Sequence, residues 1–274
     1  MLQGFHAQSQ KKIVTLTERF LESSFFLNFP KWKDRISVLI EGSVANGRYD
    51  EFSDIDLAII VPKQLQNTYT LEEIKTYKKH LRELKEPVQL HVPESYDGLL
   101  LKLEDWTQDG GLRELSRALI VTDPDKKMKE LKKRFRWYPR PIFREKLNWL
   151  FAEAAFEYKE RFEVAQKRHD PLFGECVKLN ILRYLLNACL LATKNYPSFD
   201  KHLYKDVQSI KELPKKILTT TNLLIQTHDL KQVSELLKQL FQEVESYLIK
   251  KELLTKHELQ YWIDLRPKYK VHFD

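Results

Sequence analysis

Two short apolar segments in the first quarter of the chain form the clearest pattern of hydrophobic and polar positions. Residues 36–40 read Ile-Ser-Val-Leu-Ile, and residues 55–61 read Ile-Asp-Leu-Ala-Ile-Ile-Val. Both segments are shorter than a typical helix and rich in β-branched side chains. A Gly42-Ser43 pair follows the first segment. The pattern therefore predicts two strands, over 36–41 and 54–61, with a Gly-Ser turn at the end of the first.

The same reading assigns further elements to the rest of this half. Apolar residues recur at helical spacing before the first strand, and a Thr70–Glu73 capping box precedes a second helical segment. Alternating and apolar segments later on indicate more strands. The expected elements are a helix over 9–27, a helix over 70–84, a strand over 88–92, a short helix near 112–117, a strand over 118–122, and a helix from Pro124, near its first position, to about Trp137.

Beyond Pro141 the pattern changes to long segments with helical periodicity and few glycines or prolines. Breaks fall at Asp170-Pro171, at 195–198 and near Pro214. This is typical of an all-helical domain, and we expect a bundle of four or five helices. The fold class predicted is α+β: a small α/β domain with a mixed sheet over residues 1–137, followed by a helical bundle over residues 138–274.

Candidate chemistry lies in the second apolar segment, which contains Asp54-Ile55-Asp56. Side chains alternate along a strand, so Asp54 and Asp56 are expected on one face. Two neighbouring carboxylates repel each other, and a divalent cation stabilises such a pair. Mg²⁺ takes carboxylate oxygens together with water and substrate phosphates. The Gly42-Ser43 turn adds backbone amides and a hydroxyl that suit a phosphate.

Together these residues resemble the signature of the polymerase-β-like nucleotidyltransferase superfamily. The chain reads Gly42-Ser43, ten residues, then Asp54-Ile55-Asp56, with apolar residues on both flanks. The resemblance extends over roughly the first 125 residues. The loop residues 196–204 resemble, less specifically, a helix connection of antibiotic nucleotidyltransferases that have a helical C-terminal domain.

The resemblance implies an enzyme that transfers a nucleoside monophosphate from a nucleoside triphosphate, with ATP the first candidate, to a hydroxyl group. Asp54 and Asp56 would hold Mg²⁺, and Gly42 and Ser43 would bind the phosphates, with Arg48 as a further cation. The helical domain would select a small hydroxylated acceptor, such as an aminoglycoside or lincosamide antibiotic. In members of this superfamily the active-site cleft often lies between two subunits, so the resemblance leaves open whether the protein is a homodimer.

The chain departs from the family pattern at the third strand. Members usually carry a third carboxylate there, but the polar positions of 88–92 are Gln89 and His91. His91 is a candidate general base, since a histidine pKa lies near neutrality. Glu94 and Asp97 are alternatives from the following loop. This departure leaves open a second interpretation, a nucleotide-binding module that has lost the base.

Composition sets broader limits. The 274 residues carry a net charge of +7 at pH 7, which suits an anionic ligand such as a nucleotide. Nucleic acid stays a second option, as in minimal transferases that modify a protein or an RNA end. The two cysteines, Cys176 and Cys189, fall in one predicted helix and are expected to be reduced core thiols. With neither a membrane-spanning run nor a signal-peptide pattern, we expect a cytoplasmic protein.

Overall fold

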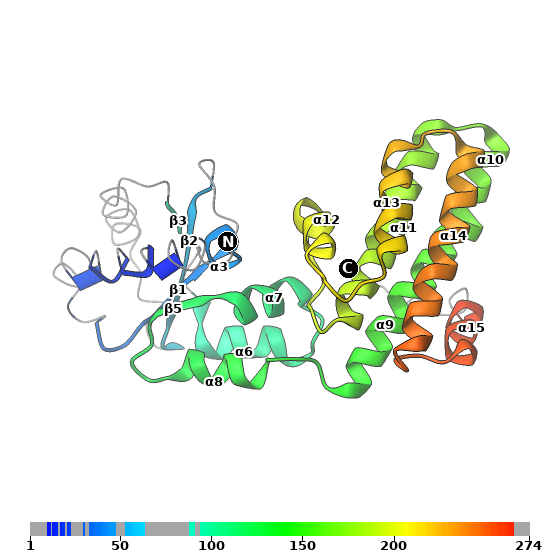
Figure 1. Cartoon of the computed structure of the whole chain (residues 1–274). Helices are drawn as coiled ribbons and strands as arrows, with labels where there is room; N and C mark the ends of the chain where they lie inside the picture. The colour runs from blue at the N-terminus through cyan, green and yellow to red at the C-terminus, as the bar shows by residue number, and fades with distance from the viewer. Residues whose placement is uncertain are drawn as a thin grey trace. The chain divides into compact units, whose positions relative to one another are not determined.

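The computed structural model divides the chain into two compact units, Met1–Trp137 and Tyr138–Asp274 (Figure 1). Each unit is considered by itself. The structure describes residues 10–11, 13–15, 17–19, 21–22, 30, 33–47, 53–63, 88–90 and 94–265. The helix expected over 70–84 and the candidate residues Arg48 and His91 lie outside these ranges. Of the first predicted helix, the described residues between 10 and 19 are helical.

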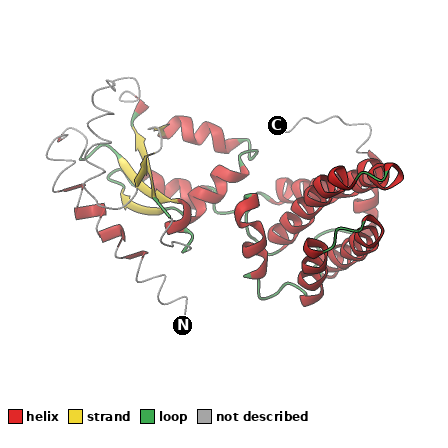
Figure 2. Cartoon of the chain, turned by 90° about the horizontal axis from the view of Figure 1, so that it is seen from above, coloured by secondary structure: helices red, strands yellow, loops and turns green. Residues whose placement is uncertain are grey.

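A mixed sheet forms the centre of the first unit (Figure 2). Its order is β3-β2-β1-β5, and β4 also pairs with β2. β1 runs antiparallel to β2 and β5, whereas β2 runs parallel to β3 and β4. The strands are β1 (Ser37–Glu41), β2 (Ile55–Val61), β3 (Val88–Leu90), β4 (Glu94–Ser95) and β5 (Leu119–Thr122). The predicted α+β class with a mixed sheet is confirmed.

Side-chain alternation gives the sheet two different faces. Every second residue of β1 and β2, together with residues of the N-terminal helix, forms one buried apolar cluster. The cluster contains Ile13, Leu21, Ile36, Val38, Ile40, Val44, Ile55, Leu57, Ile59 and Val61. The intervening positions of β1 and β2, which include Glu41 and Asp56, belong to the opposite face.

Helices connect the strands of the first unit. They include α3 (Gly42–Ala45), α6 (Tyr96–Glu104), α7 (Asp109–Arg117) and α8 (Lys127–Arg134). The expected Gly-Ser turn is thus the start of a one-turn helix. α6 was not expected, although Ser95 caps it by accepting the amide N–H of Gly98.

The connection from β5 to α8 differs from the expectation that Pro124 opens the helix. α8 begins at Lys127, three residues later. The Asp123 carboxylate accepts the amide N–H groups of Met128 and Lys129 and the hydroxyl of Ser37. Asp123 therefore accepts hydrogen bonds from the first turn of α8 although it lies four residues before the helix begins, and Pro124 lies in the turn between them.

The second unit is helical throughout its described part. Its elements are α9 (Arg140–Phe156), the π-helical turn η4 (Glu157–Phe162), α10 (Glu163–Arg168), α11 (Pro171–Ala192), α12 (Asp200–Gln208), α13 (Lys215–Gln226), α14 (Leu230–Lys250) and α15 (Lys256–Leu265). The expected breaks fall between these helices: Asp170 caps α11, and Pro214 precedes α13.

α11 is the central helix of this unit and packs against α9, η4, α12 and α14. Its C-terminal half is almost entirely buried. Cys189 lies in this core, where burial raises the pKa of its thiol to about 12. Cys176 is exposed, so the expectation of a core thiol was wrong for it, and both cysteines are free. Within the described part of the chain, no helix is long and apolar enough to cross a membrane.

Candidate functional site

The pairing of β1 with β2 brings the two halves of the sequence motif together. The antiparallel register places Glu41 opposite Asp56, so Gly42, the next residue, lies beside the Asp-x-Asp segment. Asp54 immediately precedes β2, and both aspartates are partly exposed. Residues directly opposite in an antiparallel pair project to the same face. Glu41 therefore adds a carboxylate to the face that carries Asp56.

Gly42 is the point of closest approach between the two halves. Its φ is +62°, in the left-handed region that L side chains rarely adopt. A Cβ atom at this position would lie 1.8 Å from Oδ2 of Asp56. The close packing of the Asp56 carboxylate on the backbone of Gly42 thus requires glycine for both steric and conformational reasons.

Ser43 follows Gly42 in the one-turn helix α3. Its Oγ atom is buried and has no hydrogen-bond partner among the described residues. Buried hydroxyl groups nearly always have a partner, because leaving one unpaired costs about 1–3 kcal/mol. The Ser43 hydroxyl is therefore available to a ligand at this end of the sheet.

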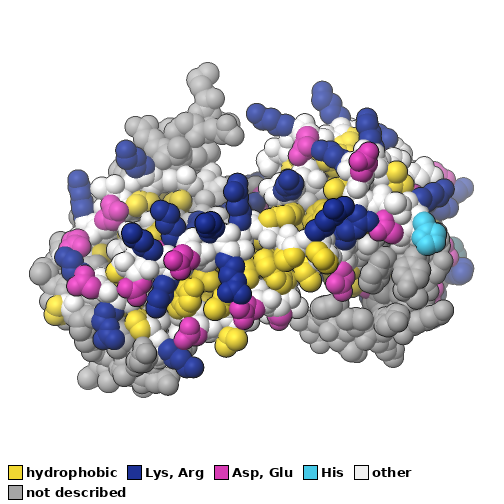
Figure 3. All heavy atoms as spheres, turned by 90° about the horizontal axis from the view of Figure 1, so that it is seen from below, with side chains coloured by type: hydrophobic (Ala, Val, Ile, Leu, Met, Phe, Trp, Pro, Cys, Tyr) yellow, Lys and Arg dark blue, Asp and Glu magenta, His cyan; other side chains and the backbone are white. Residues whose placement is uncertain are grey.

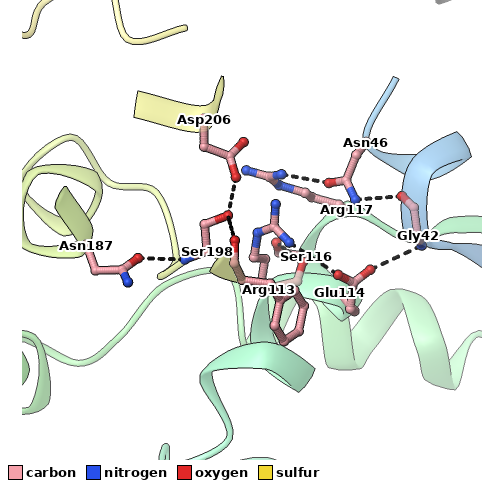
Figure 4. A network of polar contacts seen from close by, with 10 residues as sticks. Gly42, Asn46, Arg113, Glu114, Ser116, Arg117, Asn187, Ser198 and Asp206 are labelled. Carbon is pink, nitrogen blue, oxygen red and sulfur yellow. Dashed lines mark hydrogen bonds and ion pairs between the residues drawn. The ribbon is translucent and has the colours of Figure 1, made fainter. Parts of the chain in front are cut away.

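The carbonyl and amide of Gly42 are both engaged by side chains (Figure 4). The Gly42 N–H donates to Oε2 of Glu114 at 3.2 Å, and Nδ2 of Asn46 donates to the Gly42 carbonyl at 2.6 Å. Nη1 of Arg117 donates to Oδ1 of Asn46 at 2.7 Å. Arg113, which is fully buried, lies with Nη1 3.4 Å from Oε1 of Glu114. The Gly42 amide is thus occupied in this structure.

The residue of the third strand that is in register with Asp56 is not an acid. In the parallel pairing of β2 with β3, Gln89 is at the register position of Asp56. Glu94 pairs with the register position of Ile60, four residues further along β2, or about 13 Å from Asp56. It forms an ion pair with Lys102 at 2.6 Å, and Asp97 is exposed on α6. Glu94 therefore does not lie beside Asp56.

Sequence reasoning missed five residues at this site. They are Glu41, Asn46, Arg113, Glu114 and Arg117. Glu41 follows from strand pairing and could have been found by aligning the two strands from the turn. The three residues of α7 carry no such signal, because charged side chains on a short helix are typical of a solvated face. Their contacts with Gly42 and Asn46 span more than 70 residues of chain.

The donor set at the site fits a magnesium ion that arrives with a phosphate ligand. Among the described residues, no group of three or more His, Cys, Asp and Glu side chains is arranged to hold a metal. Mg²⁺, however, is usually bound by one or two carboxylates plus water and substrate phosphates rather than by a complete protein cage. Asp54 and Asp56 supply such a pair.

The loop between α11 and α12, noted for its tyrosines, is fixed within the helical unit. Tyr196 is buried, with its ring 4.8 Å from that of Tyr138. The Ser198 N–H donates to Oδ1 of Asn187 at 2.7 Å, and the Ser198 hydroxyl donates to Asp206 (Figure 4). These contacts give the loop a packing role.

Two parts of the chain match known protein families. Residues 26–109 match the family described as nucleotidyltransferase domain. This match lies within the first unit. The resemblance to the polymerase-β-like superfamily is thereby confirmed for this part of the chain. Residues 106–203 match a domain of unknown function, DUF4037, which begins in the first unit and ends in the second.

No curated protein matches the chain significantly. Among solved structures, the chain is similar to a nucleotidyltransferase-like protein from Exiguobacterium sibiricum 255-15. The sequence identity is 13% and the TM-score 0.49, over 93% of this chain and 81% of that one.

Proposed function

We propose that the chain is a nucleotidyltransferase that moves a nucleoside monophosphate from a nucleoside triphosphate, with ATP the first candidate, to a hydroxyl of a small acceptor. The observation that carries the proposal is the packing of the Asp56 carboxylate on Gly42, 1.8 Å from where a Cβ atom would lie. Such an approach leaves room for no side chain and puts the acidic and the phosphate-binding parts of the motif side by side.

The residues of the site have distinct roles in this proposal. Asp54 and Asp56 would hold Mg²⁺, which supplies charge stabilisation to the phosphates when bound. The Ser43 hydroxyl, buried and unpartnered in the described part of the chain, would donate to a phosphate oxygen. Arg48 is proposed as a further cation at the phosphates.

The reaction forms a bond between the acceptor oxygen and the α-phosphorus and breaks the bond from the α-phosphorus to the oxygen that leaves with pyrophosphate. The proton of the acceptor hydroxyl passes to a base, for which His91 is the candidate. The acceptor class proposed is a small hydroxylated molecule such as an aminoglycoside or lincosamide antibiotic, selected by the helical unit.

The test is transfer of radiolabel from α-labelled ATP, with Mg²⁺, to a panel of aminoglycosides and lincosamides, compared between the natural protein and Asp56→Asn. We expect Asp56→Asn to lose about 100-fold or more in rate, because loss of a metal-binding carboxylate removes several kcal/mol of stabilisation. Asp125→Asn is the matched control, since Asp125 is an exposed acid of the same unit with no proposed role in transfer. Unchanged transfer by Asp56→Asn would contradict the proposal.

A second candidate function is a nucleotide-binding module without turnover. Gln89 favours it, because an amide occupies the register position beside Asp56 where a third carboxylate is usual. Thermal melting combined with the transfer assay separates the two. Saturating Mg-ATP, at about 100 times its dissociation constant, should stabilise either protein by about 2.7 kcal/mol. Binding with no transfer to any acceptor identifies the module.

Modification of a protein or an RNA end is a further alternative. On the face drawn in Figure 3, many Lys and Arg side chains are present, with Asp and Glu side chains among them. A nucleic-acid backbone is bound mainly through clustered positive charge. Including a short RNA in the acceptor panel tests this alternative directly.

A further inference from the structure

Helix α7 contacts the peptide groups on both sides of the Gly42 Cα atom. On one side the Glu114 carboxylate accepts the Gly42 N–H at 3.2 Å. On the other, Asn46 binds the Gly42 carbonyl, and Arg117 donates to Asn46 at 2.7 Å (Figure 4). Glu114 and Arg117 are three residues apart, so they lie on the same side of α7. One helix thus contacts the Glu41–Gly42 peptide group directly and the Gly42–Ser43 peptide group through Asn46.

Two of these contacts, from the Gly42 N–H to Glu114 and from Arg117 to Asn46, include an ionised group. An ionised acceptor or donor makes a hydrogen bond roughly twice as strong as a neutral pair. The Glu114 carboxylate is itself oriented by Arg113, whose side chain is fully buried. The two arginines also offset the negative charge that Glu114 adds beside Asp56. A peptide held in this way keeps its conformation when a ligand approaches.

These contacts also affect the position of Ser43. With the Gly42 N–H donated to Glu114, the Gly42 amide is not available for a phosphate, whereas the Ser43 hydroxyl has no partner among the described residues. Rotation of either peptide group next to the Gly42 Cα would move Ser43 and would also disturb the contact with Asp56. The α7 contacts therefore fix the Ser43 hydroxyl relative to the Asp56 carboxylate.

We propose that Glu114, Asn46 and Arg117 are positioning residues that hold the two peptide groups flanking the Gly42 Cα, and with them Ser43, for a nucleoside triphosphate. This inference rests on the proposed function, because it assigns these residues to the same nucleotide site. They act through Gly42 and Ser43 and do not themselves take part in the transfer.

The test measures the dissociation constant of Mg-ATP by calorimetry for Glu114→Ala, Glu114→Gln and the natural protein. Glu114→Ala removes the acceptor of the Gly42 N–H, and we expect binding to weaken about tenfold. Glu114→Gln retains a side-chain oxygen that can accept the same N–H, so binding should stay within about threefold of the natural value. Glu130→Ala, which removes an exposed acid of α8, is the control and should bind normally.

A second readout does not depend on nucleotide. Exchange of the Gly42 amide hydrogen, followed by NMR, should become faster in Glu114→Ala and remain slow in Glu114→Gln. A merely structural role would give equal effects of both substitutions on melting, without this difference at Gly42. If Glu114→Ala does not fold, Asn46→Ala carries the test. It removes the side-chain link from Arg117 to the Gly42 carbonyl but leaves the backbone N–H of residue 46 bound to that carbonyl at 3.1 Å, so Mg-ATP binding should weaken about fivefold, and unchanged binding would overturn the inference.

Normal Mg-ATP binding by Glu114→Ala would overturn the inference, and so would equal weakening by Glu114→Gln and Glu114→Ala. A natural protein that binds no nucleotide would instead remove the proposed function and the nucleotide role together. In that case the exchange of the Gly42 amide still decides whether Glu114 holds this peptide, so the two failures are distinguishable.

Discussion

Both units of the chain bury charged side chains, but their hydrogen bonds end in different places. In the first unit, the side chains of α7 end on a glycine peptide with positive φ, next to a partly exposed aspartate. In the helical unit, the buried Lys178 binds Glu175 of its own helix and the carbonyl of Thr227 that follows α13. Lys178 thus connects α11 to the residue that follows α13.

A second buried charged residue of the helical unit, an acid, repeats this behaviour. Glu243 of α14 accepts from the hydroxyl of Thr220 on α13 and from Gln239 one turn earlier. A buried charge is therefore no marker of a site by itself, since it also serves to connect helices. Buried polar atoms without a partner among the described residues occur in both units. What distinguishes the first unit is that its network ends at a glycine with positive φ, packed directly against the Asp56 carboxylate.

Among the substitutions that test this difference between the units, Gly42→Ala is expected to have the largest effect. The new Cβ would displace the Asp56 carboxylate, and the positive φ adds strain of about 1–2 kcal/mol. Because a displacement of about 1 Å can cost 100-fold in rate, we expect at least about that loss in nucleotide transfer. Steady-state transfer assays on the folded variant measure it.

Gly111→Ala is the matched control for this change. A Cβ at Gly111 would make ordinary contact with Leu103 at 3.4 Å, and the position is helical. Alanine there should stabilise the protein by about 0.5–1 kcal/mol and leave transfer unchanged. Equal activity of the two variants would remove the distinction drawn for the turn.

The next effect concerns stability alone. Lys178→Met leaves the carbonyl of Thr227 without its donor and Glu175 without its buried partner. We expect the free energy of unfolding to fall by about 2 kcal/mol, with transfer kinetics unchanged at a temperature where the variant is folded. Thermal melting and transfer assays test the two parts.

Lys167→Met, at an exposed position of α10, serves as the control and should change stability by less than about 0.5 kcal/mol. A loss of transfer in folded Lys178→Met would show that the buried ion pair of the helical unit also contributes to the site.

The smallest effect is expected at the start of α15, where Thr255 and Glu258 form a capping box. A hydrogen bond from Arg144, aided by Thr255, lowers the pKa of the Glu258 carboxyl to about 2. Since the pKa is about 4.3 when unfolded, the ionised form stabilises the protein above that pH, and this contribution is lost as the pH falls toward 2.

Glu258→Gln should therefore destabilise the protein by about 1 kcal/mol at pH 7, because the pair is partly screened by solvent. The difference in stability between the two proteins should shrink below about pH 4, as the natural carboxylate protonates. Melting curves between pH 3 and pH 7 check this. A difference that stays constant with pH would mean that the charge of Glu258 contributes nothing.

Hydrophobic periodicity alone predicted the elements that surround the site. The strands at 37–41, 55–61 and 119–122 were all expected, because short apolar runs carry a local signal of burial. The helical second half was expected for the same reason. α6 was missed, since its run of leucines is short and shows little amphipathic pattern.

The chemistry of the site was only partly determined by the sequence. The Gly-Ser and Asp-x-Asp residues are close enough along the chain for their motif to be read directly, and the pairing of β1 with β2 brings them together. Tertiary structure alone decided that Glu114 and Arg117 reach the Gly42 peptide, and that Gln89 takes the register position beside Asp56. Contacts across more than 70 residues depend on how helices and strands pack, and the local pattern of a charged helix contains no information about its distant partners.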